Sequence, residues 1–283
     1  ELRTRGYELA AVSGTSMGAL VGALAAAGKD EEFADWARTL TQRRVLQLLD
    51  PVMVGPGAIR GTKVVTMLGG MLGDTTIEQL PIPFTAVATD LTSQREIWFQ
   101  SGVATVAVRA SIAIPGALTP VVLGSRVLVD GGLLNPVPME PVLASDADFT
   151  LAINLNGPDS PSAGRGAATE EAELPEGQDH RTWLARMGLS GLDLDRLLHR
   201  APREVDQEVS EAVGVGARST TDVLLSSWET AQPLPTRFRM ASNPPDVQVN
   251  VPMRICGTLD FHRAAELIDH GRRLTAEAHD QAG

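Results

Sequence analysis

A serine within a five-residue glycine motif is the first group in this chain that could act as a nucleophile. The pentapeptide Gly14-Thr15-Ser16-Met17-Gly18 fits the pattern G-x-S-x-G. It follows an apolar run that predicts a short strand, Leu9 to Val12, and precedes a run of small residues that predicts a helix from about Met17. A serine on such a strand-to-helix turn exposes its hydroxyl, because the glycines leave room for a tight turn. The alternative, on the local sequence alone, is a structural turn with a capping serine.

The helix that follows the motif would add electrostatic stabilisation to such a site. The first N–H groups of a helix have no partner within it, and together with the positive end of the helix dipole they face any oxyanion formed at its start. We therefore expect the Met17 N–H to be an oxyanion donor, with Gly14 and Gly18 shaping the elbow.

The serine hydroxyl needs a base, and an aspartate followed by two glycines is the best-placed candidate. Asp130 ends the run Arg-Val-Leu-Val-Asp and precedes Gly131 and Gly132, which allow the backbone to approach closely. A free aspartate has a pKa of about 3.9, and burial beside the serine would raise that pKa and make the carboxylate a stronger base. The alternative is an ordinary Asp-Gly turn of a hairpin. The five histidines all lie outside glycine-rich or strand-end contexts: His180, His199, His262, His270 and His279.

Apolar runs and helical patterns alternate along the chain. The runs that predict strands cover residues 81–90, 96–100, 149–155 and 247–251, and a Gly-Ser turn within 121–129 predicts a hairpin. The patterns that predict helices cover residues 103–113, 192–213, 219–231 and 261–279. Several strands are apolar on both faces, which is typical of a mainly parallel sheet covered by helices. We therefore expect a three-layer α/β/α fold with a mostly parallel central sheet.

The other segments fit a single domain over residues 1–283. Residues 30–74 change in character and predict an insertion or lid region, and residues 157–180, rich in Gly, Pro, Ala, Ser and acidic side chains, predict a mobile surface loop. Residues 9–28 are uncharged and long enough to span a bilayer. Val12 to Ser16 is a poor helix interior, however, and no aromatic belt flanks the stretch, so a strand, a turn and a buried helix are favoured.

The composition excludes several kinds of partner and site. The formal net charge is -11, so nucleic acid is not an expected partner and strong electrostatic docking on anionic membranes is disfavoured, whereas hydrophobic contact with lipid stays open. The single cysteine, Cys256, excludes an intrachain disulfide and a cysteine-based metal site. The chain starts at Glu1 with no visible signal peptide, and we expect a cytoplasmic or peripheral membrane protein whose true N-terminus is not visible.

Two motifs taken together resemble the patatin-like phospholipase family, especially its bacterial members. They are GTSMGALVGALAAAG, which begins at Gly14, and DGGLLNPVP, which begins at Asp130. The stretches PIPFTAVATDL, AVRASIAIPGALTPV and DFHRAAELIDHG also resemble that family, so the similarity spans most of the chain. The resemblance implies a patatin-like α/β domain with a Ser-Asp dyad, in which Ser16 is the nucleophile and Asp130 the base, and it implies no metal or organic cofactor. Asn135 follows the dyad loop and is a candidate to hydrogen-bond it.

One feature departs from the family's pattern. Members carry a glycine-rich oxyanion loop, roughly G-G-G-x-R/K-G, between the first strand and the elbow, whereas only residues 1–11 precede the elbow strand here. We therefore expect that this domain lacks its first strand and oxyanion loop. Residues 55–61 resemble that loop but follow the nucleophile, so we interpret them as the approach to a helix in the insertion.

The resemblance implies a lipid acyl hydrolase that cleaves fatty acyl esters, phospholipid or lysophospholipid, through an acyl-enzyme, with peripheral membrane contact as an expected partner interaction. Two alternatives remain. The absent oxyanion loop favours a catalytically silent lipid-binding or interaction module on the same fold. A Ser-His-Asp hydrolase would instead need a histidine such as His262, whereas the dyad makes Asp130 essential and every histidine dispensable.

Overall fold

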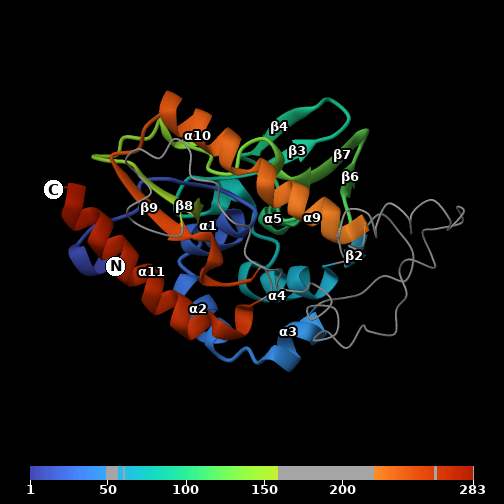
Figure 1. The fold of residues 1–283 in the computed structure, drawn as a ribbon, viewed down its shortest axis with the longest axis horizontal. Helices are drawn as coiled ribbons and strands as arrows, with labels where there is room; N and C mark the ends of the chain where they lie inside the picture. The colour runs from blue at the N-terminus through green and yellow to red at the C-terminus, as the bar shows by residue number, and fades with distance from the viewer. Residues whose placement is uncertain (49–56, 60, 159–219, 258–259, 283) are drawn as a thin grey trace, which may run out of the picture. The chain divides into compact units, whose positions relative to one another are not determined.

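The computed structural model describes residues 1–48, 57–59, 61–158, 220–257 and 260–282. Almost all of them belong to one compact unit, residues 1–166 and 229–283, drawn in colour in Figure 1. The other unit, residues 167–228, is described only from Thr220 onward. The helix predicted over 192–213 and the predicted loop beyond residue 158 lie outside the described residues.

Strands and helices alternate along the described chain. The strands are β1 (Val12–Thr15), β2 (Gly57–Ile59), β3 (Phe84–Asp90), β4 (Arg95–Phe99), β5 (Gly116–Leu118), β6 (Val121–Leu123), β7 (Arg126–Asp130), β8 (Leu151–Gly157) and β9 (Val247–Pro252). The helices are α1 (Met17–Ala26), α2 (Asp30–Arg38), α3 (Gln42–Leu48), α4 (Thr62–Leu72), α5 (Ala104–Ser111), α9 (Thr220–Ala231), α10 (Pro233–Ser242) and α11 (Ala264–Ala282). Two short 3₁₀ helices that bear on the site are η3 (Gly131–Leu133) and η4 (Glu140–Val142).

Strand β3 is the centre of the sheet that carries the candidate site. One of its edges is occupied by β4, which runs antiparallel. The other edge is shared by two strands: β1 runs parallel to the first half and ends with Thr15 opposite Val87, and β7 runs antiparallel to the second half and ends with Asp130 opposite Ala88. Because β1 and β7 run towards each other, their carboxyl ends meet on this edge. The sheet thereby brings Ser16, the residue after β1, next to Asp130.

Helices cover this sheet, and the three-layer α/β/α class predicted from the sequence is confirmed. The sheet is mixed rather than mostly parallel: among its described strands β1 runs parallel to β3, whereas the pairs of β3 with β4, β3 with β7 and β6 with β7 are antiparallel. Strand β6 extends the sheet beyond β7 as the second arm of the predicted hairpin, while β2 pairs with β5 and β8 with β9, both in parallel. Helices α1 and α5 pack against each other and against β3, and α11 packs against β9 (Figure 1). On α10, Met240 packs with Val137, Met139 and Ala152.

The apolar run over residues 9–28 is divided between a strand and a helix. β1 ends at Thr15 and α1 begins at Met17, and α1 packs closely on the sheet. A Cβ placed on Gly22 would lie 2.9 Å from Cγ1 of Val12, so glycine permits this approach. Within the described residues no helix combines the length and the apolar character needed to cross a bilayer.

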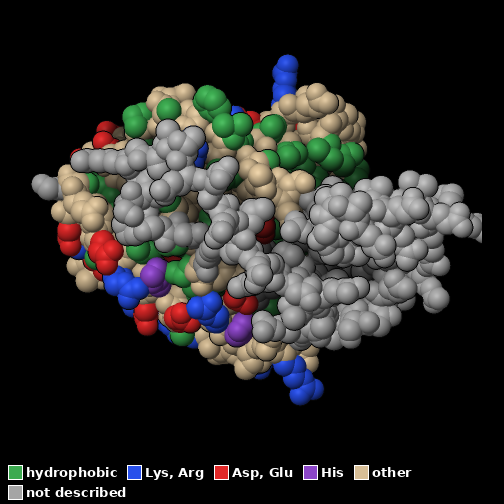
Figure 2. Space-filling model, viewed as in Figure 1, with side chains coloured by type: hydrophobic (Ala, Val, Ile, Leu, Met, Phe, Trp, Pro, Cys, Tyr) green, Lys and Arg blue, Asp and Glu red, His purple; other side chains and the backbone are tan. Residues whose placement is uncertain are grey.

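Hydrophobic side chains gather in one part of the face shown in Figure 2. They lie along the upper edge of the view, over α10 and β6, while most of the charged side chains and the histidines in this view lie below, over α11 and α2. The exposed apolar residues on α10 are Leu234 and Phe238, and those on β6 are Val122 and Leu123. The molecule therefore presents bulky apolar groups to solvent on both of these elements.

Candidate active site

Ser16 has an unusual backbone conformation at the corner between β1 and α1. Its φ is 55° and its ψ is -121°, outside the regions that residues with a side chain favour. Among the described non-glycine residues, only Gln94 shares a positive φ. The N–H groups of Ala19 and Leu20 both donate to the Ser16 carbonyl, at 3.0 and 3.1 Å. Strain of this kind persists only where the surroundings enforce it, and it is concentrated at functional sites.

The two glycines of the elbow motif have different roles. A Cβ on Gly14 would lie 2.2 Å from the backbone carbonyl carbon of Gly18, so the turn can close only without a side chain there. Gly18 itself is exposed, and a Cβ placed on it would meet nothing within 4 Å. Gly14 is therefore required by the geometry of the elbow, and Gly18 lies opposite it on the first turn of α1.

Met17 is the first residue of α1, so its N–H is one of those at the helix start that have no helical partner. This N–H belongs to the peptide bond that directly follows Ser16. An oxyanion formed on a substrate carbonyl at Ser16 would lie at the positive end of the α1 dipole. The helix therefore starts where the sequence predicts it, and the role of the Met17 N–H as an oxyanion donor stays a prediction.

A buried serine anchors the elbow to β3. The Ser16 N–H donates to Oγ of Ser111, at 2.9 Å, and that hydroxyl donates to the carbonyl of Val87, at 2.5 Å. Ser111 is the last residue of α5 and is completely buried. The backbone of Ser16 is therefore fixed to β3, the strand with which Asp130 also pairs, at Ala88.

Ser111→Ala is expected to lower both stability and ester turnover. The change leaves the Ser16 N–H without its acceptor, and an unsatisfied buried donor costs about 1–3 kcal/mol. We expect thermal unfolding at a lower temperature and a lower kcat, because the backbone that carries the hydroxyl loses its anchor. The exposed Ser125→Ala is the matched control. Equal melting temperature and kcat for the two variants would contradict this role of Ser111.

Asp130 is buried at the end of β7, and only 1% of its surface is exposed. Its Oδ1 accepts the Gly132 N–H, at 2.8 Å, which caps η3. A Cβ on Gly131 would lie 2.3 Å from the Val87 carbonyl oxygen, so only glycine allows the dyad loop to pass so close to β3. Oδ2 of Asp130 makes no hydrogen bond of normal geometry within the described residues.

Burial raises the pKa of Asp130 to about 7, against the lowering influence of the Ser16 hydroxyl and the Gly132 N–H. The hydroxyl of Ser16 is thus near enough to act on this carboxyl, although no normal hydrogen bond joins the two side chains. Contacts between a base and its nucleophile are often long before substrate binds. A carboxylate with a pKa near 7 can both accept and return a proton at neutral pH.

Asn135 joins the residues that flank the two candidate groups. Its carbonyl accepts the Thr15 hydroxyl, at 2.7 Å, and its N–H donates to the Gly131 carbonyl, at 2.8 Å. The sequence predicts Asn135 as a hydrogen-bonding partner of the dyad loop, but nothing in it indicates that Thr15 contacts Asn135. Thr15 lies at the variable position of G-x-S-x-G, and its partner follows more than a hundred positions later.

The alternative candidates for the base and the oxyanion loop make no hydrogen bond to Ser16 or Asp130 within the described residues. Of the described histidines, His262, His270 and His279, none hydrogen-bonds to Ser16 or Asp130, whereas His279 contacts the Tyr7 hydroxyl at 2.9 Å. The other two histidines lie outside the described residues. Residues 55–61 resemble the family's oxyanion loop in sequence only. Residues 57–59 form β2 and Gly61 precedes α4, which agrees with the interpretation of this stretch as the approach to a helix.

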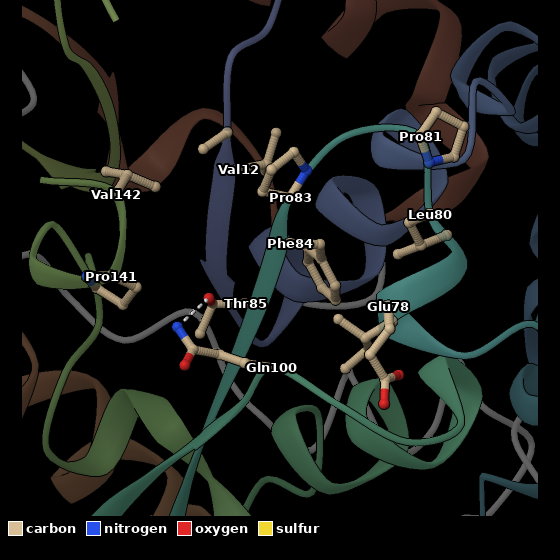
Figure 3. Close-up of a pocket in the computed structure, with 12 residues that line it drawn as sticks. Val12, Glu78, Leu80, Pro81, Pro83, Phe84, Thr85, Gln100, Pro141 and Val142 are labelled. Carbon is tan, nitrogen blue, oxygen red and sulfur yellow. Dashed lines mark hydrogen bonds between the residues drawn. The ribbon is translucent and has the colours of Figure 1, made fainter. Parts of the chain in front are cut away.

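A cavity of about 410 Å³ lies beside the opposite end of β1 (Figure 3). Val12 and Phe84 line it from the starts of β1 and β3, and Pro141 and Val142 face them from η4. The Gln100 amide donates to the Thr85 hydroxyl within it, at 3.2 Å. Neither Ser16 nor Asp130 contributes to its wall, so this cavity is separate from the candidate site.

Comparison with known proteins identifies the family. A family model described as patatin-like phospholipase matches residues 2–143. This chain belongs to the patatin-like phospholipase family. Membership indicates a lipid hydrolase, and the matched residues include the Ser16 elbow, β3, the Asp130 loop and Asn135.

Several curated proteins are similar to the chain. An uncharacterized NTE family protein of Mycobacterium bovis is 37% identical over 315 aligned positions, which cover 98% of this chain and 85% of that protein. The patatin-like phospholipase domain-containing protein 7 of Rattus norvegicus is 27% identical over 157 positions, covering 52% of this chain and 11% of that protein. The neuropathy target esterase sws of Drosophila melanogaster is 27% identical over 165 positions, covering 56% and 12%.

Proposed function

We propose that this patatin-like protein is a serine esterase that cleaves fatty acyl esters, phospholipids or lysophospholipids, through a Ser16–Asp130 dyad. The observation that carries the proposal is the meeting of two strand ends on one edge of β3, which puts a strained serine beside a buried carboxyl. Serine at a strand-to-helix elbow is the arrangement that exposes a nucleophilic hydroxyl.

The proposed reaction proceeds through an acyl-enzyme. Asp130 removes the proton from the Ser16 hydroxyl while the oxygen attacks the ester carbonyl carbon. The tetrahedral intermediate then collapses and the bond to the alcohol oxygen breaks. Asp130 gives its proton to that oxygen, and the alcohol leaves. Water, deprotonated by Asp130, attacks the acyl-enzyme, and the proton returns to Ser16 as the fatty acid leaves. The Met17 N–H stabilises the oxyanion in both steps.

A phospholipid substrate lies in a lipid surface, which the protein would have to contact. The exposed Leu234 and Phe238 of α10 would support peripheral contact through apolar burial rather than through charge, which fits the formal net charge of -11. The names of two relatives, a phospholipase domain protein and an esterase, support the same class of reaction.

A fluorophosphonate probe tests the proposal, because it phosphonylates an activated serine and releases fluoride. We expect labelling of the wild type at Ser16 and none of Ser16→Ala, with the site identified by peptide mass spectrometry. The labelling rate should rise as pH increases through about 7 and then level off, since Asp130 is a base only when it has lost its proton.

Absence of labelling in a folded wild type would rule out the enzyme and leave the lipid-binding module on the same fold. Labelling whose rate stays constant from pH 5 to pH 9 would exclude Asp130 as the titrating base. Probe hydrolysis without protein, measured at each pH, is the control for the chemistry of the probe itself.

A further inference from the structure

A cluster of charged side chains lies behind Asn135. The Asn135 amide Nδ2 donates to Oε2 of Glu96, at 2.9 Å, and to Oε2 of Glu140, at 3.2 Å. These carboxylates also share one cation: Arg239 donates to Oε1 of Glu140, at 2.6 Å, and to Oε1 of Glu96, at 3.3 Å. The four side chains come from β4, the segment after η3, η4 and α10, so α10 is tied to the strands of the site.

The Asn135 side chain depends on these two carboxylates for its orientation. The residue is completely buried, and its Oδ1 makes no hydrogen bond within the described residues. Carboxylates can only accept hydrogen bonds, so they fix which end of the amide faces them. Because Oδ1 adds no contact, Glu96 and Glu140 provide the side-chain hydrogen bonds that hold Asn135 in place.

Arg239 makes it possible for the two carboxylates to share one amide. Glu96 and Glu140 both approach the same nitrogen, and two negative charges in a partly buried place repel each other unless a cation neutralises them. Burial raises the pKa of Glu140, but hydrogen bonds from Arg239, from the backbone N–H of Glu140 itself and from Asn135 outweigh it and keep that pKa below its usual value. The guanidinium binds both acids through a planar fork that a lysine cannot reproduce.

We propose that Arg239 is a positioning residue for the esterase site: it holds Glu96 and Glu140 together on Asn135, which in turn fixes the Ser16 elbow against the Asp130 loop. The inference rests on the proposed function for its catalytic consequence. The last link is the pair of Asn135 backbone contacts, to the Thr15 hydroxyl on one side and to the Gly131 carbonyl on the other.

Loss of the Arg239 guanidinium would therefore affect the site through repulsion between the Glu96 and Glu140 carboxylates. In Arg239→Met, one of the two carboxylates must leave the Asn135 amide, and the Asn135 backbone is released with it. A displacement of about 1 Å between reacting groups can cost about 100-fold in rate. We expect Arg239→Met to lower kcat for a short-chain ester by about 10- to 100-fold with little change in KM.

A double variant separates this mechanism from loss of packing. Glu140→Gln removes one of the two charges and keeps an oxygen that can accept from Asn135. We expect it to restore most of the kcat lost in Arg239→Met, because the repulsion disappears. Arg237→Met, an exposed arginine on the same helix, is the matched control with unchanged kcat. Arg239→Lys, which keeps the charge without the fork, should fall between wild type and Arg239→Met.

The inference is overturned if Arg239→Met and Arg237→Met have equal kcat, or if Glu140→Gln adds to the loss instead of relieving it.

Hydrogen exchange by mass spectrometry gives a readout that does not require activity. Peptides over residues 12–16 and 130–136 should exchange faster in Arg239→Met and return to the wild-type rate in the double variant. Should the wild type fail to label with the fluorophosphonate while exchange follows this pattern, the proposed esterase fails and the positioning role stands. Unchanged exchange in Arg239→Met overturns the positioning role.

Discussion

Asp130→Asn is expected to lower kcat about 10⁴-fold while making the protein more stable at pH 8. Asparagine keeps the shape of the side chain and the oxygen that accepts the Gly132 N–H, but it cannot take a proton from Ser16. In a Ser-His-Asp triad, replacing the aspartate that only orients the histidine costs on the order of 10⁴ in rate. Asp130 is proposed as the base itself, so we expect its replacement to cost at least as much. Catalysis and stability therefore respond in opposite directions to one change.

The gain in stability follows from the raised pKa of Asp130. The pKa of Asp130 is about 7 in the folded protein, whereas the ordinary value of 3.8 applies to the unfolded chain. Between pH 3.8 and about 7, Asp130 is therefore protonated in the folded state and ionised in the unfolded state. The free energy of unfolding of the wild type consequently falls as pH rises from about 4 to about 7, where the buried group becomes charged. The asparagine that replaces Asp130 in the variant carries no charge at any pH and escapes this cost.

Esterase assays and thermal melts of Asp130→Asn at pH 5 and pH 8 check both parts. The melting temperature should exceed that of the wild type at pH 8, and the difference should shrink at pH 5. His262→Ala and His270→Ala are the controls for turnover, and both should retain it. A large loss in either histidine variant, with little loss in Asp130→Asn, would replace the dyad by a Ser-His arrangement.

Gly14→Ala is expected to prevent the elbow from forming, whereas Gly18→Ala is expected to be tolerated by the fold. The added methyl group at position 14 would lie 2.2 Å from the Gly18 carbonyl, in backbone that cannot move without opening the turn. Overpacking a closed site typically costs about 1–3 kcal/mol, and rigid backbone on both sides puts this change at the upper end or beyond. At position 18 the methyl group meets open space, and alanine favours a helix by about 1 kcal/mol over glycine.

Soluble yield and melting temperature of the two variants, measured side by side, test this contrast. Gly14→Ala should be poorly soluble or melt many degrees lower, and Gly18→Ala should melt at or above the wild-type temperature. Similar melting temperatures for the two variants would show that the elbow is looser than its backbone contacts indicate.

Local sequence patterns were sufficient to predict the elements around the site. The strands predicted over 81–90, 96–100 and 247–251 correspond to β3, β4 and β9 within a few residues, and the hairpin predicted over 121–129 is β6 and β7. The first strand, predicted over Leu9 to Val12, instead runs from Val12 to Thr15, because its pairing with β3 starts at Val12 and continues through Gly14 to the elbow. Glycine is a poor strand former by itself, and here its pairing with Ala86 overrides that preference.

Long-range partners were not predictable from the sequence. Nothing in the sequence around Glu96, Glu140 or Arg239 indicates that they meet, because each is an ordinary charged residue and their contacts depend on tertiary packing. Helix α10 was also missed, since Pro233 and Pro235 discourage a helical interpretation, yet both prolines fall in its first turn, where an N–H is not needed. Ser16 and Asp130, by contrast, are next to glycines whose spacing is a local signal.

The head-to-head arrangement of β1 and β7 on β3 has a consequence for how such a protein can vary. The distance between the hydroxyl and the carboxyl depends on which β3 residues their strands pair with, not on the length of chain that connects them. Loops and whole segments inserted between the two strands leave that ladder unchanged. Slipping β7 by one residue would carry Asp130 away from Ser16 and turn every β7 side chain to the opposite face of the sheet. Loops between these elements can therefore change in length without altering the site, so long as this hydrogen-bonded register and the Ser111 anchor are preserved.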